Sequence, residues 1–178
     1  MHWMMALLAG FGCCALGFAV SGAAARRLQA LRAGVQAIQA IRVGVCVRGE
    51  VLARVLQELP AGESPEARAW TEFFARVGNA LASGPGASLP ETWREAWIQA
   101  VRAHPALRSL SEEDLRLLHP LREGLGRTPR EEQQTLLDGV CKELQAQHES
   151  LRPKLADSQK IAQTLGMLGG LALFLLLI

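Results

Sequence analysis

The sequence lacks the patterns that carry familiar enzyme chemistry. Its 178 residues contain no zinc-ligand spacing, nucleophile elbow, phosphate-binding loop or dinucleotide fingerprint. The four histidines, His2, His104, His119 and His148, are scattered, and none has the partner spacing of a catalytic base or a metal site. We therefore expect a protein that is not an enzyme, with no catalytic residue, no cofactor and no bound metal.

Cysteine pairing and a strong net charge are also missing. Cys13 and Cys14 are adjacent in an apolar run, and Cys46 and Cys141 are isolated, so no pair has metal-ligand or redox spacing. A net charge of +2 is too small to indicate a nucleic-acid partner. Free apolar thiols and a partner other than nucleic acid are the expectations.

Charge is absent from both ends of the chain. Ile161–Ile178 has no charged side chain, and as a helix it would span about 27 Å, close to the roughly 30 Å hydrocarbon core of a bilayer. Met1–Val20 is also uncharged, and Arg26 is the first ionic residue. We predict transmembrane helices at residues 1–25 and 161–178; a buried core helix is the other interpretation of the second run.

The flanking charges predict the orientation of these spans. Basic residues near transmembrane ends stay in the cytoplasm. The basic residues that follow the first run or precede the second are Arg26, Arg27, Arg32, Arg152, Lys154 and Lys160. We expect two spans in the cell membrane, a cytoplasmic domain over residues 26–160 and both termini outside. A cleaved signal peptide with a site at Ala23–Ala25 is the alternative for the first span, although it would lack a basic start.

Apolar spacing in the middle of the chain predicts helices throughout, with no alternating strand pattern. One amphipathic helix is expected over Arg26–Val47, ended by Gly49. Further helix starts are predicted by capping residues and prolines at Ser64–Pro65, Ser88 with Glu91, Ser111 with Asp114, and Thr128–Pro129. The expected fold is all-α, a cytoplasmic bundle of about six helices with a transmembrane helix at each end. Pro120 and Pro153 should interrupt or bend their helices.

Two features have both a structural and a functional interpretation. Trp93 and Trp97 stand one turn apart on the helix predicted after Ser88, where we expect core packing rather than a ligand cage. Arg127, Arg130, Glu131 and Glu132 form the densest group of charges near a helix start. Capping and a solvated helix face explain that group, and a docking surface for a partner protein is the functional alternative.

Small residues recur at four-residue spacing inside the apolar runs. Ala9, Cys13 and Gly17 form one row, and Gly166 and Gly170 form another. Such rows let membrane helices approach closely, so we predict that the two spans cross there. The plainer explanation is that glycine is common in transmembrane helices.

Read as a whole, the chain resembles the stage III sporulation protein AB family. The matching stretches, which extend from the first apolar run to the last, are RRLQALRAGVQAIQAI, FFARVGNALASG with ETWREAW, LGRTPREEQ and LGMLGGLALFLLLI. Where the family usually has Tyr-Gly before Thr-Pro-Leu, this chain has Val43-Gly44 and then Cys46-Val47-Arg48. The glycine is kept, and the aromatic ring and the proline are lost.

The resemblance implies a platform subunit of the channel, or secretion-like complex, between mother cell and forespore in endospore formation. It implies a location in the mother-cell membrane facing the forespore, a domain similar to those of type II secretion platform proteins, and partners that include a secretion-type ATPase, other channel subunits and the lipid bilayer. Homo-oligomerisation stays open. A small transporter or channel subunit is the alternative function, although neither run places an ionisable residue at bilayer depth. A membrane-docked enzyme is a third, weaker reading.

Overall fold

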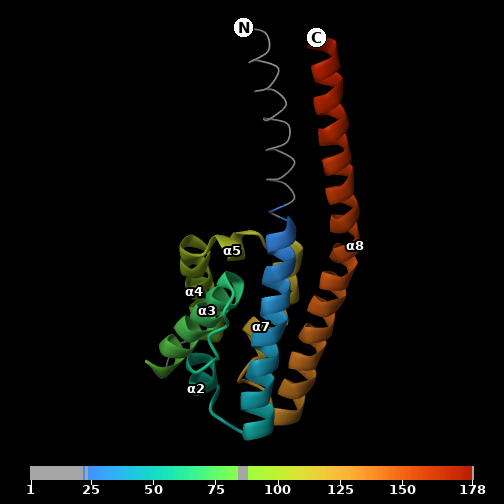
Figure 1. Cartoon of the computed structure of the whole chain (residues 1–178). Helices are drawn as coiled ribbons and strands as arrows, with labels where there is room; N and C mark the ends of the chain where they lie inside the picture. Colours follow the sequence, from blue (N-terminus) through green and yellow to red (C-terminus); the bar gives the residue numbers. More distant parts are fainter. Residues whose placement is uncertain (1–21, 23, 84–87, 178) are drawn as a thin grey trace. The chain divides into compact units, whose positions relative to one another are not determined.

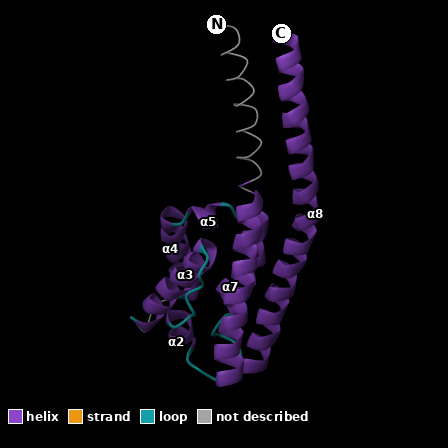
Figure 2. Cartoon of the chain, in the orientation of Figure 1, coloured by secondary structure: helices purple, strands orange, loops and turns teal. Residues whose placement is uncertain are grey.

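The computed structural model describes residue 22, residues 24–83 and residues 88–177. This part of the chain is helical with no strand, so the all-α class is confirmed (Figure 2). Its contacts separate two compact units. One, Arg26–His148, is a helical domain; the other includes the chain from Glu149 onward. The predicted boundary after residue 160 falls twelve residues further along the same helix, within α8 (Arg130–Leu177).

The domain begins with a helix over Ala24–Arg48. One face of this helix packs inside the domain, where Ala30, Ile38 and Ile41 are completely buried. It is the one helix, among the residues described, that is long and apolar enough to cross a membrane, and half of its most apolar stretch is buried inside the protein. Neither predicted span is confirmed. Residues 1–21 lie outside the described part, and residues 161–177 are helical as the end of α8.

This first helix ends in a π-helical segment, η1 (Val43–Arg48). Gly49 has φ +69°, a left-handed conformation that glycine adopts readily, and its N–H donates to the carbonyl of Gly44. A Cβ on Gly44 would lie 2.6 Å from a methyl carbon of Val55 in α2 (Leu52–Gln57). The glycine that this chain keeps at the family's Tyr-Gly position therefore permits the close approach of η1 and α2.

Helices α3 (Pro65–Ala82) and α4 (Leu89–Ala103) pack against each other, and α2 packs on α3 (Figure 1). The predicted start of α3 is confirmed, because the Ser64 hydroxyl accepts a hydrogen bond of 3.1 Å from the amide of Ala67. Ser88 does precede α4, but its side chain makes no capping bond, so the predicted capping box with Glu91 is wrong. Pro90 in the first turn needs no amide partner and helps to start α4 without that bond.

The chain between α4 and α8 forms three short helices, α5 (Pro105–Arg108), α6 (Glu112–Leu117) and α7 (His119–Gly124). The sequence did not predict α5. The segment predicted as one helix is divided into α6 and α7, because Pro120 follows directly after the start of the new helix and cannot continue the old one. The domain therefore has more and shorter helices than expected.

Aromatic side chains of α3 and α4 form the centre of the core. Trp70, Phe73 and Phe74 are at most 1% exposed. The ring of Trp93 meets Phe73 edge-on at a centroid distance of 4.9 Å, a favourable geometry for aromatic pairs. The indole N–H of Trp70 donates a buried hydrogen bond of 2.8 Å to the carbonyl of Ala30, which attaches α3 to the first helix.

Helix α8 is 48 residues long and continues without a break through Pro153. At 1.5 Å per residue its length is about 72 Å. The predicted start near Thr128 is confirmed, although the Thr128 hydroxyl has no hydrogen-bond partner in the described part of the chain and the Gln133 side chain instead donates to the Thr128 carbonyl at 2.7 Å. An ion pair of 2.8 Å between Asp138 and Arg42 joins α8 to the first helix within the domain.

Candidate docking groove

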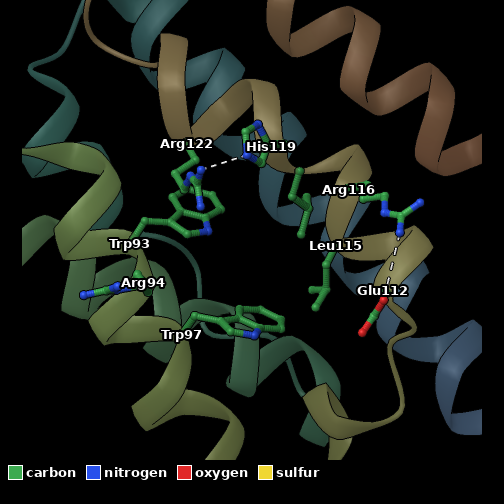
Figure 3. A pocket seen from close by; sticks show the side chains of 9 residues that line it. Trp93, Arg94, Trp97, Glu112, Leu115, Arg116, His119 and Arg122 are labelled. Atoms are coloured by element: carbon green, nitrogen blue, oxygen red, sulfur yellow. Dashed lines mark hydrogen bonds and ion pairs between the residues drawn. The ribbon is translucent and has the colours of Figure 1, made fainter.

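A groove of about 340 Å³ lies between α4 and the α6–α7 segment and opens to solvent (Figure 3). Its floor is apolar and its rim is charged. The side chains that define it are Trp93, Arg94 and Trp97 from α4, and Leu115, Arg116 and Arg122 from α6 and α7. Such a combination of aromatic floor and arginine rim is typical of protein interfaces, where tryptophan and arginine are enriched.

The tryptophan wall of the groove is held rigidly by the core behind it. Trp93 is 6% exposed and contacts Phe73 and Phe74, with ring centroids 4.9 Å and 5.8 Å away. Trp97 is less buried and contacts Phe73 edge-on at 5.3 Å. Core packing was the prediction for both residues. It describes Trp93, whereas Trp97 also offers part of its ring to the groove.

The opposite wall is held by an ion pair on the far side of α6, between the buried Asp114 and the partly exposed Arg27. Asp114 is 1% exposed and receives two hydrogen bonds from the Arg27 guanidinium, of 2.8 Å and 3.0 Å. Ser111 and Asp114 form the predicted capping box, and Arg27 also donates to the Ser111 hydroxyl. This bidentate contact joins α6 to the first helix.

The same cluster lowers the pKa of Asp114. Burial is the largest single influence and raises the pKa, because it disfavours the charged carboxylate. Hydrogen bonds from Arg27 and the Ser111 amide, together with the charge of Arg27 and the Ser111 hydroxyl, outweigh it, so the pKa lies below its usual range. Asp114 is therefore an ionised structural residue.

The rim of the groove is predominantly basic. Arg94 makes no ion pair with any described residue, and Arg116 has only a long contact of 4.0 Å with Glu112, whose side chain is 92% exposed. Arg122 lies 2.7 Å from Nε2 of His119 (Figure 3). A guanidinium can only donate, so Nε2 of His119 is the acceptor in this contact. The groove thus has three arginines on its rim and one lining carboxylate.

The predicted docking group at the start of α8 is only partly available for a partner. Arg127, Glu131 and Glu132 are exposed. The guanidinium of Arg130 donates to the carbonyls of Cys46 and Val47, at 2.6 Å from Nε and 3.0 Å from Nη2 respectively. These carbonyls belong to the end of a helix, where they lack helical partners and carry the negative end of the helix dipole. The structure therefore gives Arg130 a role inside the chain, as a cap of η1.

The predicted membrane-packing rows stay predictions. Ala9, Cys13 and Gly17 lie outside the described residues. Gly166 and Gly170 stand one turn apart in α8, in a part of the helix that the structure describes only by its backbone.

Titratable side chains within the described residues form no group of three that could hold a metal ion. His104 pairs with Glu72 at 2.7 Å on the surface, and the pKa of Glu72 is lowered first by its hydrogen bond from Arg76 and then by that from His104. Cys46 and Cys141 are free and buried, and burial raises the pKa of both thiols. A raised thiol pKa disfavours the reactive thiolate.

Sequence reasoning did not find the groove, although one signal was present. Arg94, Trp97 and Ile98 share a face of α4 at three- and four-residue spacing, and Ile98 remains 45% exposed. An arginine and two large apolar residues on one partly exposed face are typical of a contact surface. The arginines of α6 and α7 that complete the rim come from a segment that the sequence predicted as one helix, interrupted or bent at Pro120.

Comparison with known proteins identifies the family. The model of the family described as stage III sporulation protein AB matches residues 2–178. No curated protein and no solved structure matches the chain significantly. The family match covers the helical domain and both apolar ends, which the resemblance of the individual stretches had indicated. The chain therefore belongs to the stage III sporulation protein AB family, a family of sporulation proteins.

Proposed function

We propose that the protein is a non-enzymatic platform subunit of the channel, or secretion-like complex, between mother cell and forespore, and that it links the ATPase of that complex to membrane components. Two spans would hold it in the mother-cell membrane facing the forespore, with the domain in the cytoplasm and both termini outside. Membership in a sporulation family supports the setting.

The observation that carries this proposal is the continuity of α8. Within the domain, α8 buries Leu137 and Leu144, at 0% and 2% exposure. The same helix then continues to Leu177 through a stretch that has no charged residue after Lys160. A helix satisfies its own backbone hydrogen bonds, so such a stretch is suited to a bilayer. In this proposal the same helix would belong to a protein-binding domain and to a membrane anchor, which is the arrangement a platform needs.

The domain surface supports interaction rather than passive anchoring. Its groove has the tryptophan and arginine lining described above. The exposed charges of Arg127, Glu131 and Glu132 are a second proposed contact with the ATPase. Homo-oligomerisation through other faces is compatible with both.

A deletion strain tests the proposal. Loss of the protein should block spore development after engulfment and leave vegetative growth unchanged, and the full-length gene should restore spore counts. Photo-crosslinkers placed along α8 and the domain surface in sporulating cells should name an ATPase and channel subunits as neighbours. A normal spore count without a paralogue, or an intact protein that is freely soluble after cell breakage, would contradict the platform role.

A further inference from the structure

We infer that the groove between α4 and the α6–α7 segment is a docking site for an acidic amphipathic helix of a partner protein. This inference rests on the proposed platform role and names the surface and the kind of partner that the role requires. It differs from the contact predicted at the start of α8 in two ways. The groove lies on other helices, and it combines apolar side chains with arginines, whereas the group at the start of α8 is charged throughout.

The shape of the groove fits a helix. Trp93 and Trp97 are one helical turn apart on one wall, and Leu115 stands on the other (Figure 3). A partner helix with apolar residues at positions i, i+3 and i+4 presents side chains at the same interval, which is the usual mode of helix-in-groove recognition. A volume of about 340 Å³ is enough for one or two large apolar side chains from such a helix.

The charge of the rim selects an acidic partner. Arg94, Arg116 and Arg122 lie at the outer edge of the groove, and Glu112 is the one carboxylate among the lining residues. Arg122 also has an ion pair of 3.6 Å with Glu123, which is not a lining residue. Nε of Arg122 is buried without a hydrogen-bond partner among the described residues. Carboxylates one turn to either side of an apolar anchor would reach these guanidinium groups, whereas lysines there would be repelled.

The groove is also preorganised for binding. Its α4 wall is backed by the aromatic core, and its α6 wall is held by the Arg27–Asp114 pair. Rigid walls lose little conformational freedom when a ligand binds, so more of the contact free energy contributes to affinity.

The test uses the full-length chain in detergent micelles and a fluorescently labelled synthetic peptide of about 18 residues, long enough to form a helix. The peptide carries leucines on one face and glutamates on the other. Fluorescence anisotropy should show binding that weakens as salt is added, because surface charge pairs are screened. A scrambled peptide of the same composition should bind at least about tenfold more weakly, since it cannot place its leucines on one face.

Matched variants locate the site. Arg94→Glu and Arg116→Glu should each weaken binding of the glutamate peptide several-fold. A peptide in which lysines replace the glutamates should bind these two variants more tightly than it binds the wild type. Arg68→Glu makes the same charge change at an exposed position of α3 outside the groove and should bind like the wild type. Glu132→Arg, in the surface predicted at the start of α8, should also leave peptide binding unchanged. Trp97→Phe, which keeps an aromatic ring, should reduce affinity less than Trp97→Ala.

The outcomes separate this inference from the platform role. Equal binding by Arg94→Glu and Arg68→Glu, or equal binding of the ordered and scrambled peptides, would overturn the docking groove and leave the platform role standing. Normal sporulation of the deletion strain together with groove-dependent peptide binding would overturn the platform role and leave the docking groove. Circular dichroism of each variant identifies any loss of binding that is caused by unfolding.

Discussion

Two sets of charged side chains lie on opposite sides of α6, and they differ in what they contact. Asp114 is buried and its carboxylate is fully bonded by Arg27 and Ser111. Arg116 is 79% exposed and has a single ion pair at the limit of contact distance. The Asp114 carboxylate thus has its partners inside the chain, whereas most of the Arg116 side chain is open to solvent. A charged side chain that is fully hydrogen-bonded within the chain stabilises the fold, whereas an exposed one with few contacts is available to a partner.

Removal of Arg27 should give the largest effect. Arg27→Ala leaves the Asp114 carboxylate without its counter-charge. Because the Arg27 side chain is 23% exposed, the pair is only partly buried, and we expect the free energy of unfolding to fall by about 1–3 kcal/mol, the cost of leaving a buried acceptor unsatisfied. Denaturant unfolding of the full chain in detergent would measure the loss. Arg68→Ala, at an exposed site without an ion pair among the described residues, is the control and should change stability by less than about 0.5 kcal/mol. Similar losses in both variants would mean that Arg27 is not a structural residue.

Acid should weaken the same contact without a mutation. The folded-state pKa of Asp114 is lowered, so the unfolded chain takes up this proton first as the pH falls. The stabilisation is complete above the ordinary carboxyl pKa of about 3.9 and is lost as the pH falls through the lower folded value. Glu72 contributes with the same sign. The melting temperature measured against pH should therefore fall less steeply below pH ~4 in Asp114→Asn than in the wild type. Parallel curves for the two proteins would show that protonation of Asp114 does not contribute to the loss of stability in acid.

The smallest effect on stability is expected at the rim of the groove. Arg94 has no ion pair among the described residues, so Arg94→Glu should change the free energy of unfolding by less than about 0.5 kcal/mol. The same variant is expected to bind the peptide several-fold more weakly and, in cells, to lower spore counts. A large loss of stability in Arg94→Glu would show that the rim serves the fold, and the contrast between the two sides of α6 would disappear.

Local signals in the sequence predicted most helix boundaries. Gly49, Ser64 and Pro120 each end or begin a helix where their backbone preferences require it. Ser88 shows the limit of this reasoning, because the residue type was right for a capping bond and the bond is absent. Helix α5 was missed because four residues are too few for a periodic pattern.

Contacts across long sequence separations could not be predicted. Arg27 and Asp114 are 87 residues apart, and Arg130 reaches a helix end 84 residues earlier. The local pattern marked Asp114 as a capping residue and Arg130 as a member of a charged group, but it named no distant partner, and only the packing of α6 and α8 on the first helix brings the partners together. Periodicity likewise placed Trp93 and Trp97 on one face of α4. It could not say that the next helices would leave part of that face uncovered.

The course of α8 has a mechanical consequence. Pro153 lacks an amide hydrogen, so the carbonyl of Glu149 has no partner in the helical ladder, and Glu149 is where the chain leaves the helical domain. The rod is softest against bending at this joint. Force applied to its apolar end would be absorbed there as a change of tilt, and the helices of the domain would keep their packing.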